Sequence, residues 1–346
     1  MQRMIFALLL SLALVLLAVP KLIPVLRKMK FGQTIYELGP QSHKQKQGTP
    51  TMGGLMMAGA VLVACLVCHP AQWFGWQDFM LALLAVSLLS MLVGFADDYI
   101  KVVKKRSLGL TPWQKIAGQV IIAVGFSAYC YFHPQVGSAI YIPFANVEWD
   151  LGIFYIPLLS LTVLFMINSA NLQDGLDGLL SSVTAVGGTA WGMMALFFML
   201  AVADTSAAYG QNLYSAAIFG LAVAGAAMGF LRFNHYPATV FMGDTGSMFI
   251  GGATVGLAML LRQPFMLLLI AFTMVMSSVS VIIQRYYYKA TRKIFGEPRR
   301  LFKMTPIHHH FELSGMSETQ IVAMYAVVTG ILSLVAILSL YGLKVA

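Results

Sequence analysis

Long apolar segments dominate this sequence and decide its fold class. A helix needs about 20 apolar residues to cross the hydrocarbon core of a bilayer. We count ten such segments, at 3–26, 52–69, 78–98, 113–132, 153–170, 179–203, 212–231, 246–262, 265–288 and 319–342. The first continues to Ile23 without a signal-peptidase site, so we interpret it as a retained span. The sequence therefore predicts an all-α integral membrane protein of ten transmembrane helices, forming a single domain over residues 1–346.

The composition agrees with a lipid environment. Hydrophobic residues make up 59% of the chain and charged residues only 10%, whereas a soluble domain carries roughly 25% charged residues. The three cysteines include a C-x-x-C pair, Cys65 and Cys68, inside an apolar run with no second pair, which favours helix packing over a disulfide or zinc site. Glycine pairs such as Gly188/Gly192 predict close helix packing, and the segment 133–152 is compatible with a short hairpin.

Lysine and arginine residues set the expected orientation. Ten spans place both termini on one side of the membrane. If that side is external, Arg3, Arg262 and Lys344 lie outside and the other 19 of the 22 basic residues lie inside, as the positive-inside rule requires. We therefore expect external termini and interpret the net charge of +9 as a topogenic signal, because its division among short loops argues against nucleic-acid binding.

This topology places most carboxylates on the cytosolic side. Nine of the 13 acidic residues fall there, and five of them lie at or near span ends: Asp97, Asp98, Asp174, Asp177 and Asp244. Carboxylates at that depth are costly and usually functional. The sequence thus predicts an active-site cleft on the cytosolic face.

Asp97 and Asp98 close the third span. Negative charge at a helix C-terminus is disfavoured by roughly 0.3–1 kcal/mol per carboxylate, and two adjacent acids also repel each other. One interpretation is an interfacial cap, a role that lysines would fill better. The other is a metal ligand or a general base, whose unfavourable environment tunes its pKa.

The segment between spans five and six combines amides, acids and glycines. Asn168, Asn171 and Asp174 recur every three residues, so one helical face can carry all three, and Asp177 follows. Gly175 lets the backbone approach a ligand closely. A simple turn is the alternative, but a turn does not require this set of side chains.

Asp244 opens the eighth span. It could cap that helix through Ser247, or it could hold a hard cation. Mg²⁺ takes one or two carboxylates, keeps several waters and also uses substrate phosphates. Because no cysteine lies near these acids in the sequence, we favour Mg²⁺ over zinc.

Two further segments suit phosphate groups. Lys46 precedes the second span, for which Thr49 is a plausible N-cap and Pro50 a suitable first helical residue, and such a helix N-terminus favours anions. The last cytosolic loop carries His308, His309 and His310. Consecutive residues do not share a helical face, so they form a poor tripod for one metal. They could bind phosphate or shuttle protons, or belong to a solvated loop.

Together these five segments resemble the phospho-N-acetylmuramoyl-pentapeptide transferase family of the polyprenyl-phosphate N-acetylhexosamine-1-phosphate transferase superfamily. The strings 48–54 and 306–312 look like hallmarks of the muramoyl branch, while Ser169, Ala170 and Gln173 depart conservatively from the familiar central motif. The resemblance implies transfer of phospho-N-acetylmuramoyl-pentapeptide from its UDP carrier to undecaprenyl phosphate, giving lipid I and UMP for peptidoglycan synthesis. It also implies Mg²⁺ dependence, a homodimer, and a multi-pass protein of the bacterial inner membrane with its active site facing the cytoplasm.

The resemblance also implies roles for individual residues. Asp244 would hold Mg²⁺, and Asp98 with Asp97 would deprotonate or orient the lipid phosphate, with a covalent phospho-aspartate as the older alternative. Phe241 would stack on uracil. Asn168 and Asp174 would also bind substrate. The remaining expected substrate-binding residues are Asn171, Gly175, Leu176 and Asp177 around the nucleoside, and Lys46, Thr51, Lys101, Lys105, Lys115, His308, His309 and His310 around phosphates, with His308 also catalytic.

Two alternatives stay open. A sister enzyme would use UDP-N-acetylglucosamine as the sugar donor. A secondary transporter would also carry intramembrane carboxylates, but transporters place their binding groups near the bilayer midplane on broken helices. The acids here lie near the cytosolic ends of spans, which favours the enzyme.

Overall fold

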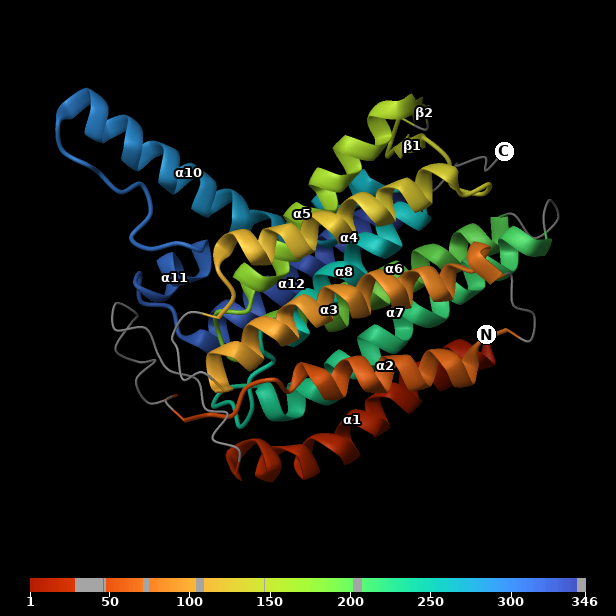
Figure 1. Ribbon diagram of the computed structural model, residues 1–346, viewed down its shortest axis with the longest axis horizontal. Coiled ribbons are helices and arrows are strands. Elements are labelled where there is room, and N and C mark those ends of the chain that lie inside the picture. Colours follow the sequence, from red (N-terminus) through yellow and green to blue (C-terminus); the bar gives the residue numbers. More distant parts are fainter. Residues whose placement is uncertain are drawn as a thin grey trace.

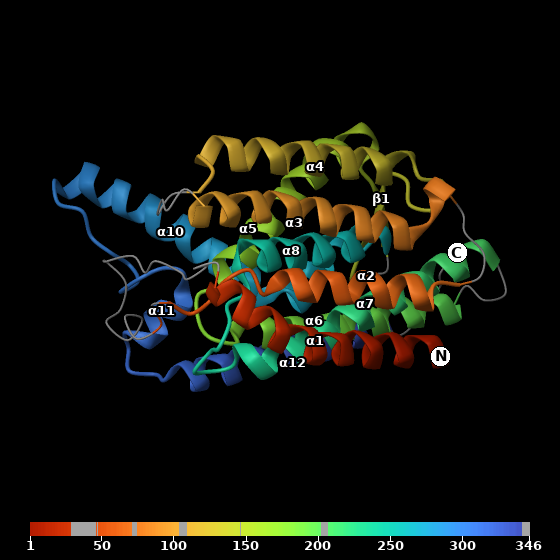
Figure 2. The same cartoon turned by 60° about the horizontal axis from the view of Figure 1, so that its bottom comes forward.

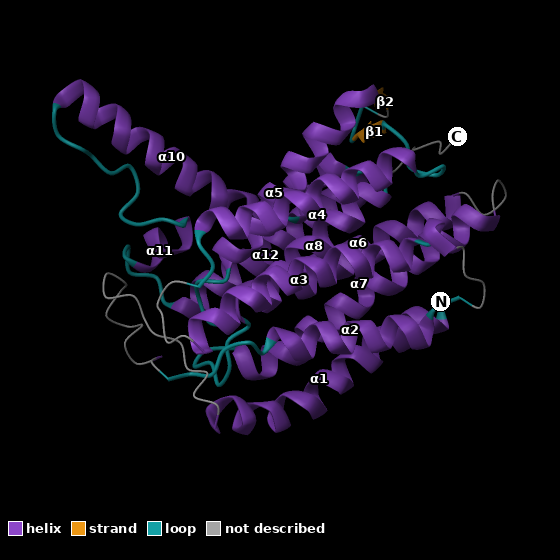
Figure 3. Cartoon of the chain, viewed as in Figure 1, coloured by secondary structure: helices purple, strands orange, loops and turns teal. Residues whose placement is uncertain are grey.

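The computed structural model describes residues 1–28, 46, 48–70, 75–103, 109–145, 147–201 and 207–340. Within these ranges the chain is almost entirely helical, and most of the long helices run side by side in one bundle (Figure 1). Figure 3 shows strands only in one short hairpin at an end of the bundle. The predicted all-α class is therefore confirmed.

Twelve α-helices and two strands make up the described part. The helices are α1 (Gln2–Lys28), α2 (Gly54–Cys68), α3 (Phe79–Val103), α4 (Pro112–Phe132), α5 (Tyr155–Gln173), α6 (Leu179–Ala201), α7 (Ala207–Asn234), α8 (Gly243–Leu260), α9 (Leu267–Ile270), α10 (Phe272–Phe295), α11 (Ile307–Glu312) and α12 (Glu318–Leu338). Strands β1 (Ala139–Ile142) and β2 (Val147–Asp150) pair antiparallel, with Ala139 opposite Asp150. Short 3-10 turns occur at Gly75–Gln77, Gly152–Phe154 and Pro264–Met266.

Each of the ten predicted spans coincides with helical structure. Seven helices of the described residues are long and apolar enough to cross a membrane, or up to eight if α9 and α10 form one span across their 90° bend. The second and eighth predicted spans correspond to α2, with 15 residues, and α8, with 18 residues, which are not among these. A membrane-embedded bundle is thus confirmed at the level of apolar helices.

Helices α7 and α8 form the interior of the bundle, since 16 of the 18 residues of α8 are buried and α7 is the most buried of the long apolar helices. The most apolar window of α7 is 78% buried, against 22% for α1 and 28% each for α4 and α12. The outer helices expose large apolar side chains such as Leu17, Ile121 and Leu334, as expected for surfaces in contact with lipid. The predicted close packing of the glycine pairs is internal to the chain, since Gly188 faces Ala224 and Gly225 faces the Leu8 carbonyl.

The helix ends that carry the predicted site residues lie at one end of the bundle. The C-terminal ends of α3 and α5 meet the N-terminal ends of α2, α8 and α12 there, and α11 lies beside them (Figure 2). The β1–β2 hairpin and the start of α1 lie at the opposite end (Figure 1). The acids that the sequence places near cytosolic span ends therefore share one end of the molecule.

The crossing of α2 and α8 depends on two glycines at that end. A Cβ atom on Gly54 would lie 2.2 Å from the Gly246 Cα and 2.4 Å from its nitrogen, and backbone cannot move aside as a flexible side chain can. Gly59, on the same helix, has nothing within 4 Å of such an atom. Gly59 therefore serves as the control position for a substitution at Gly54.

We predict that Gly54→Ala lowers the thermal unfolding temperature of the purified protein in detergent. Overpacking costs about 1–3 kcal/mol or more of unfolding free energy. Gly59→Ala should leave stability unchanged or raise it by up to about 1 kcal/mol, because alanine favours helix. Equal unfolding temperatures for the two variants would contradict this account of the α2–α8 crossing.

Candidate active site

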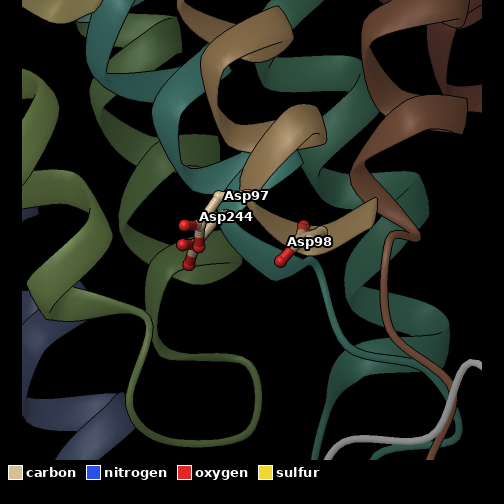
Figure 4. Close-up of side chains that lie close together, drawn as sticks. All are labelled: Asp97, Asp98 and Asp244. Atoms are coloured by element: carbon tan, nitrogen blue, oxygen red, sulfur yellow. The ribbon is translucent and has the colours of Figure 1, made fainter. Parts of the chain in front are cut away.

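Three carboxylates meet where α3 ends and α8 begins. Asp97 and Asp98 lie in the last two turns of α3, and Asp244 is the second residue of α8. One oxygen of each lies within 4.8 Å of the others. Figure 4 shows Asp97 and Asp244 side by side, with Asp98 set apart. Gly94 permits this approach, since a Cβ there would lie 2.1 Å from the Asp244 carbonyl oxygen.

The two acids of α3 have different surroundings. Oδ2 of Asp98 accepts hydrogen bonds from the backbone nitrogen of Thr245 (2.9 Å) and from its hydroxyl (2.7 Å). These bonds tie Asp98 to the first turn of α8, where the helix dipole favours negative charge. Asp97 accepts a hydrogen bond from the Leu110 nitrogen (2.8 Å) and pairs with Lys101 at 2.5 Å. Asp98 is therefore held by the first turn of α8, whereas Asp97 is held by Lys101 and by the backbone that precedes α4.

Asp244 is the most connected acid of the cluster. Its Oδ2 accepts from Lys115 (2.8 Å) and from Lys101 (3.0 Å), and its Oδ1 accepts from the amide of Asn171 (2.8 Å). Asn171 also donates to the hydroxyl of Ser247 (2.9 Å). The side chain of Asp244 thus joins α3, α4, α5 and α8. Two ammonium groups and three carboxylates share one small volume.

The polar face predicted on α5 is present, with divided roles. Asn171 reaches Asp244, whereas Asn168 donates to the Gln119 side chain of α4 (2.8 Å) and to the Leu164 carbonyl. Asp174 follows the last residue of α5. Burial, together with the charges of Asp244 and Asp98, raises the pKa of Asp174 to about 8. Asp174 is therefore largely protonated at neutral pH.

A second charged cluster lies beside the first. The Nζ of Lys46 contacts Asp177 at 2.8 Å and Glu318 at 2.7 Å. Burial opposes the charge of Lys46, but the hydrogen bonds that it donates to both carboxylates, together with their negative charge, outweigh burial and raise the pKa of the ammonium group. Asp177 also accepts from the Ala238 nitrogen (2.9 Å). The sequence predicts roles for Lys46 and Asp177 but not for Glu318, because Glu318 has the pattern of an ordinary first-turn acid of the last span.

The three histidines of α11 face different partners. His308 is buried, and a Cβ on Gly175 would lie 2.3 Å from its Nε2, so only glycine at 175 leaves room for the ring. His309 pairs with Glu312 at 3.0 Å, and Nδ1 of His310 accepts from the Lys303 nitrogen. Of the three, His308 contacts the Asp174–Asp177 segment.

The start of α2 is pinned to the start of α8 by backbone hydrogen bonds. The Phe241 nitrogen donates to the Pro50 carbonyl (2.8 Å), and the nitrogens of Gly53 and Gly54 donate to residues 241 and 242. The predicted helix start at Thr49 and Pro50 is wrong, because α2 begins at Gly54 without a side-chain cap. These backbone hydrogen bonds to the residues before α8 keep residues 50–53 out of the helix.

The remaining predicted residues divide between site and core. A Cβ on Gly243 would lie 2.8 Å from the Thr51 hydroxyl and 2.5 Å from Asp98 Oδ2, so Thr51 borders the acidic cluster. Phe241 is half-buried. Leu176 is buried in the hydrophobic core. Lys105 lies outside the described residues.

The raised pKa of Asp174 leads to a pH prediction. An unfolded aspartate ionises near pH 3.8, whereas the folded group keeps its proton up to about pH 8. Its contribution to stability is full below the unfolded pKa and declines as the pH rises toward 8. We therefore expect the unfolding temperature of the parent protein to fall more steeply than that of Asp174→Asn between pH 5.5 and 8.5, measured by differential scanning fluorimetry.

Asp150→Asn on the β1–β2 hairpin, at the opposite end of the bundle, serves as the control. Hydrogen bonds from Ser138 and Gly152 lower the pKa of Asp150, so its contribution is lost only at acidic pH and its removal should leave the slope above pH 5.5 unchanged. Parallel curves for the parent and Asp174→Asn would contradict the assignment.

Comparison with known proteins identifies the family of this chain. The model of glycosyl transferase family 4 matches residues 80–262, a range that contains all three acids of the cluster. A phospho-N-acetylmuramoyl-pentapeptide-transferase of Clostridium kluyveri is 41% identical over 98% of this chain and 100% of its own length. Proteins of the same name from Bacillus subtilis and Heliobacterium modesticaldum are 44% and 45% identical, covering 94% and 93% of both chains respectively. The chain therefore belongs to glycosyl transferase family 4 and, within it, to the phospho-N-acetylmuramoyl-pentapeptide transferases.

Proposed function

We propose that this protein transfers phospho-N-acetylmuramoyl-pentapeptide from UDP-N-acetylmuramoyl-pentapeptide to undecaprenyl phosphate, giving lipid I and UMP in peptidoglycan synthesis. One observation carries the proposal beyond family membership. Helices α3, α4 and α8 bring Asp97, Asp98 and Asp244 together with Lys101 and Lys115 at one end of an apolar bundle. Such a site can receive a charged diphosphate from the aqueous side and a phosphate that is anchored in lipid.

The reaction itself requires little covalent chemistry from the protein. An oxygen of the lipid phosphate forms a bond to the sugar-proximal phosphorus, and the bond from that phosphorus to the UMP oxygen breaks. Positioning and charge neutralisation dominate phosphoryl transfer. Lys101 and Lys115 would supply positive charge, since both ammonium groups lie within 3.0 Å of Asp244. Asp98 and Asp97 would orient or deprotonate the lipid phosphate; a phospho-aspartate route would use the same carboxylates.

The donor set of the cluster suits Mg²⁺. Three carboxylates offer hard oxygen ligands within 4.8 Å of one another, and Mg²⁺ prefers such oxygens together with water and phosphate. We assign Asp244 as the principal ligand, with Asp97 nearest to it. When bound, the ion would neutralise the diphosphate. Lys101 and Lys115 contact the same Asp244 oxygen, so they compete with a cation there and become available to phosphate groups when one binds.

The neighbouring residues would bind the rest of the nucleotide substrate. Phe241 would stack on uracil, with Asn171, Gly175 and Asp177 near the nucleoside. Lys46, Thr51 and the α11 histidines would face phosphates. The observation in favour is their placement, because Lys46, Asp177 and His308 all border the segment that follows α5.

We further propose that all ten apolar segments cross or enter the plasma membrane, with external termini and the acidic cluster at the cytosolic surface. The distribution of basic residues supports this orientation, as does the position of the acids at one end of the bundle. By analogy with the family we expect a homodimer.

Release of UMP by the purified protein tests the function directly. UDP-N-acetylmuramoyl-pentapeptide is supplied with and without undecaprenyl phosphate and with and without Mg²⁺, in detergent and without any gradient. Release that requires both lipid and metal supports the proposal. Release of UMP from UDP-N-acetylglucosamine but not from UDP-N-acetylmuramoyl-pentapeptide would assign the chain to the sister reaction. No release from either donor would contradict the proposal.

The metal assignment yields a separate prediction. Asp244→Ala should reduce UMP release by at least about 10²–10³-fold, the usual cost of losing one essential electrostatic group. Asp150→Ala on the external hairpin is the matched control and should retain full activity. Near-normal turnover by Asp244→Ala, with an unfolding temperature like that of the control, would refute the assignment.

A further inference from the structure

The C-terminal half of α10 leaves the bundle. Both views show this helix extending away from the other helices (Figures 1 and 2). Its side chains from Ile282 to Phe295 are mostly exposed, including Tyr286 at 68% and Ile294 at 71%. We call residues 282–303 the α10 arm. Nothing in the catalytic proposal uses these side chains.

The arm is held together by hydrogen bonds between α10 and the chain that follows it. The chain returns along α10 after Gly296, and two side chains of the helix hold it. Gln284 accepts from the nitrogens of Leu301 and Phe302 at 3.0 Å and donates to the Phe302 carbonyl at 3.0 Å. Further along α10, the Thr291 hydroxyl accepts a hydrogen bond from the Arg299 nitrogen at 2.9 Å.

The exposed surface of the arm is divided into two stripes. Ile283, Tyr286, Ala290 and Ile294 recur at intervals of three and four residues, which places them on one apolar face of the helix. Arg285, Lys289 and Arg292 recur in the same way on an adjacent face, and Lys293 borders them. We name the first three cations the basic stripe. An apolar face flanked by a basic face is typical of helices that lie in a membrane interface.

The charge of the arm is largely uncompensated. It carries seven exposed cations, Arg285, Lys289, Arg292, Lys293, Arg299, Arg300 and Lys303, against the single acid Glu297. Arg299 lies 4.8 Å from the ring centre of Phe295. Within the described residues, none of the basic stripe forms an ion pair. A surface of this sign beside exposed apolar side chains is complementary to an anionic lipid leaflet.

We propose that the α10 arm is a binding surface for anionic lipid headgroups, with its apolar stripe toward the acyl chains and its basic stripe on lipid phosphates. The arm is joined to the candidate site, because the Lys303 nitrogen donates to His310 and the Ile307 nitrogen donates to Ser280 of α10. Anionic lipids are thereby concentrated next to α11. In the proposed reaction, on which this last step rests, the acceptor is itself an anionic lipid.

Lipid proximity can be measured without turnover. Ile294→Cys is labelled with a fluorescent donor in the full-length protein, whose native cysteines at 65, 68 and 130 are buried. The protein is reconstituted in phosphatidylcholine vesicles containing a trace of acyl-labelled phosphatidylglycerol or of acyl-labelled phosphatidylcholine. We expect energy transfer to phosphatidylglycerol to exceed that to phosphatidylcholine about threefold, because each cation near the surface attracts the anionic lipid. High salt should abolish the difference.

Two triple variants separate the arm from net charge. Arg285→Gln/Lys289→Gln/Arg292→Gln should bring the transfer ratio close to one. Lys21→Gln/Arg27→Gln/Lys28→Gln removes the same charge from exposed positions of α1 and should keep the ratio. A transfer ratio of one in the parent protein would overturn the proposal. So would an equal fall of the ratio in both triple variants, or evidence that the labelled arm contacts a second protomer instead of lipid.

A kinetic measurement tests the link to the reaction. In the same vesicles the arm variant should raise the KM for undecaprenyl phosphate several-fold, while kcat and the KM for the nucleotide substrate stay unchanged. An unchanged acceptor KM would overturn the coupling to the site. Absence of turnover in the parent protein would instead contradict the proposed function, and the lipid-proximity result would stand independently.

Discussion

The contacts of Asp244 hold the functional end of this molecule together. Its two carboxylate oxygens receive Lys101 from α3, Lys115 from α4 and Asn171 from α5, and the residue itself begins α8. Removing one partner from a buried set of charges is costly, because the others lose their compensation. The acids and bases of the cluster therefore stabilise one another before any substrate arrives. A phosphate-bearing substrate would exchange these internal pairs for pairs with itself.

Close helix packing makes this cluster possible. Gly94 allows the Asp244 carbonyl to approach α3, and Gly54 allows the first turn of α8 to approach α2. In lipid, helix association relies on van der Waals contact and on small residues rather than on a hydrophobic driving force. The same glycines that stabilise the bundle thus determine how near the carboxylates lie. Stability and site geometry are coupled through the positions of α3 and α8.

Hydropathy and charge suffice to predict much of this protein. Apolar runs locate the helices, and acids at equal depth predict that Asp97, Asp98 and Asp244 meet. Local patterns do not predict three-dimensional pairing. Glu318 reaches Lys46 only because the start of α12 packs beside the segment after α5. Local patterns also place the start of α2 too early, because the backbone of Gly53 and Gly54 pairs with residues 241 and 242. The 90° bend at Ala271 is likewise not predicted from the sequence, because no proline lies at the break.

The central claim is that Asp244 binds the catalytic cation, and Mn²⁺ binding tests it most directly. Electron paramagnetic resonance of the purified protein with UDP and Mn²⁺ distinguishes bound from free metal without requiring turnover. We expect bound Mn²⁺ in the parent protein and in Asp150→Asn, and its loss in Asp244→Asn. Equal binding by Asp244→Asn and the parent protein would contradict the claim and would place the cation elsewhere.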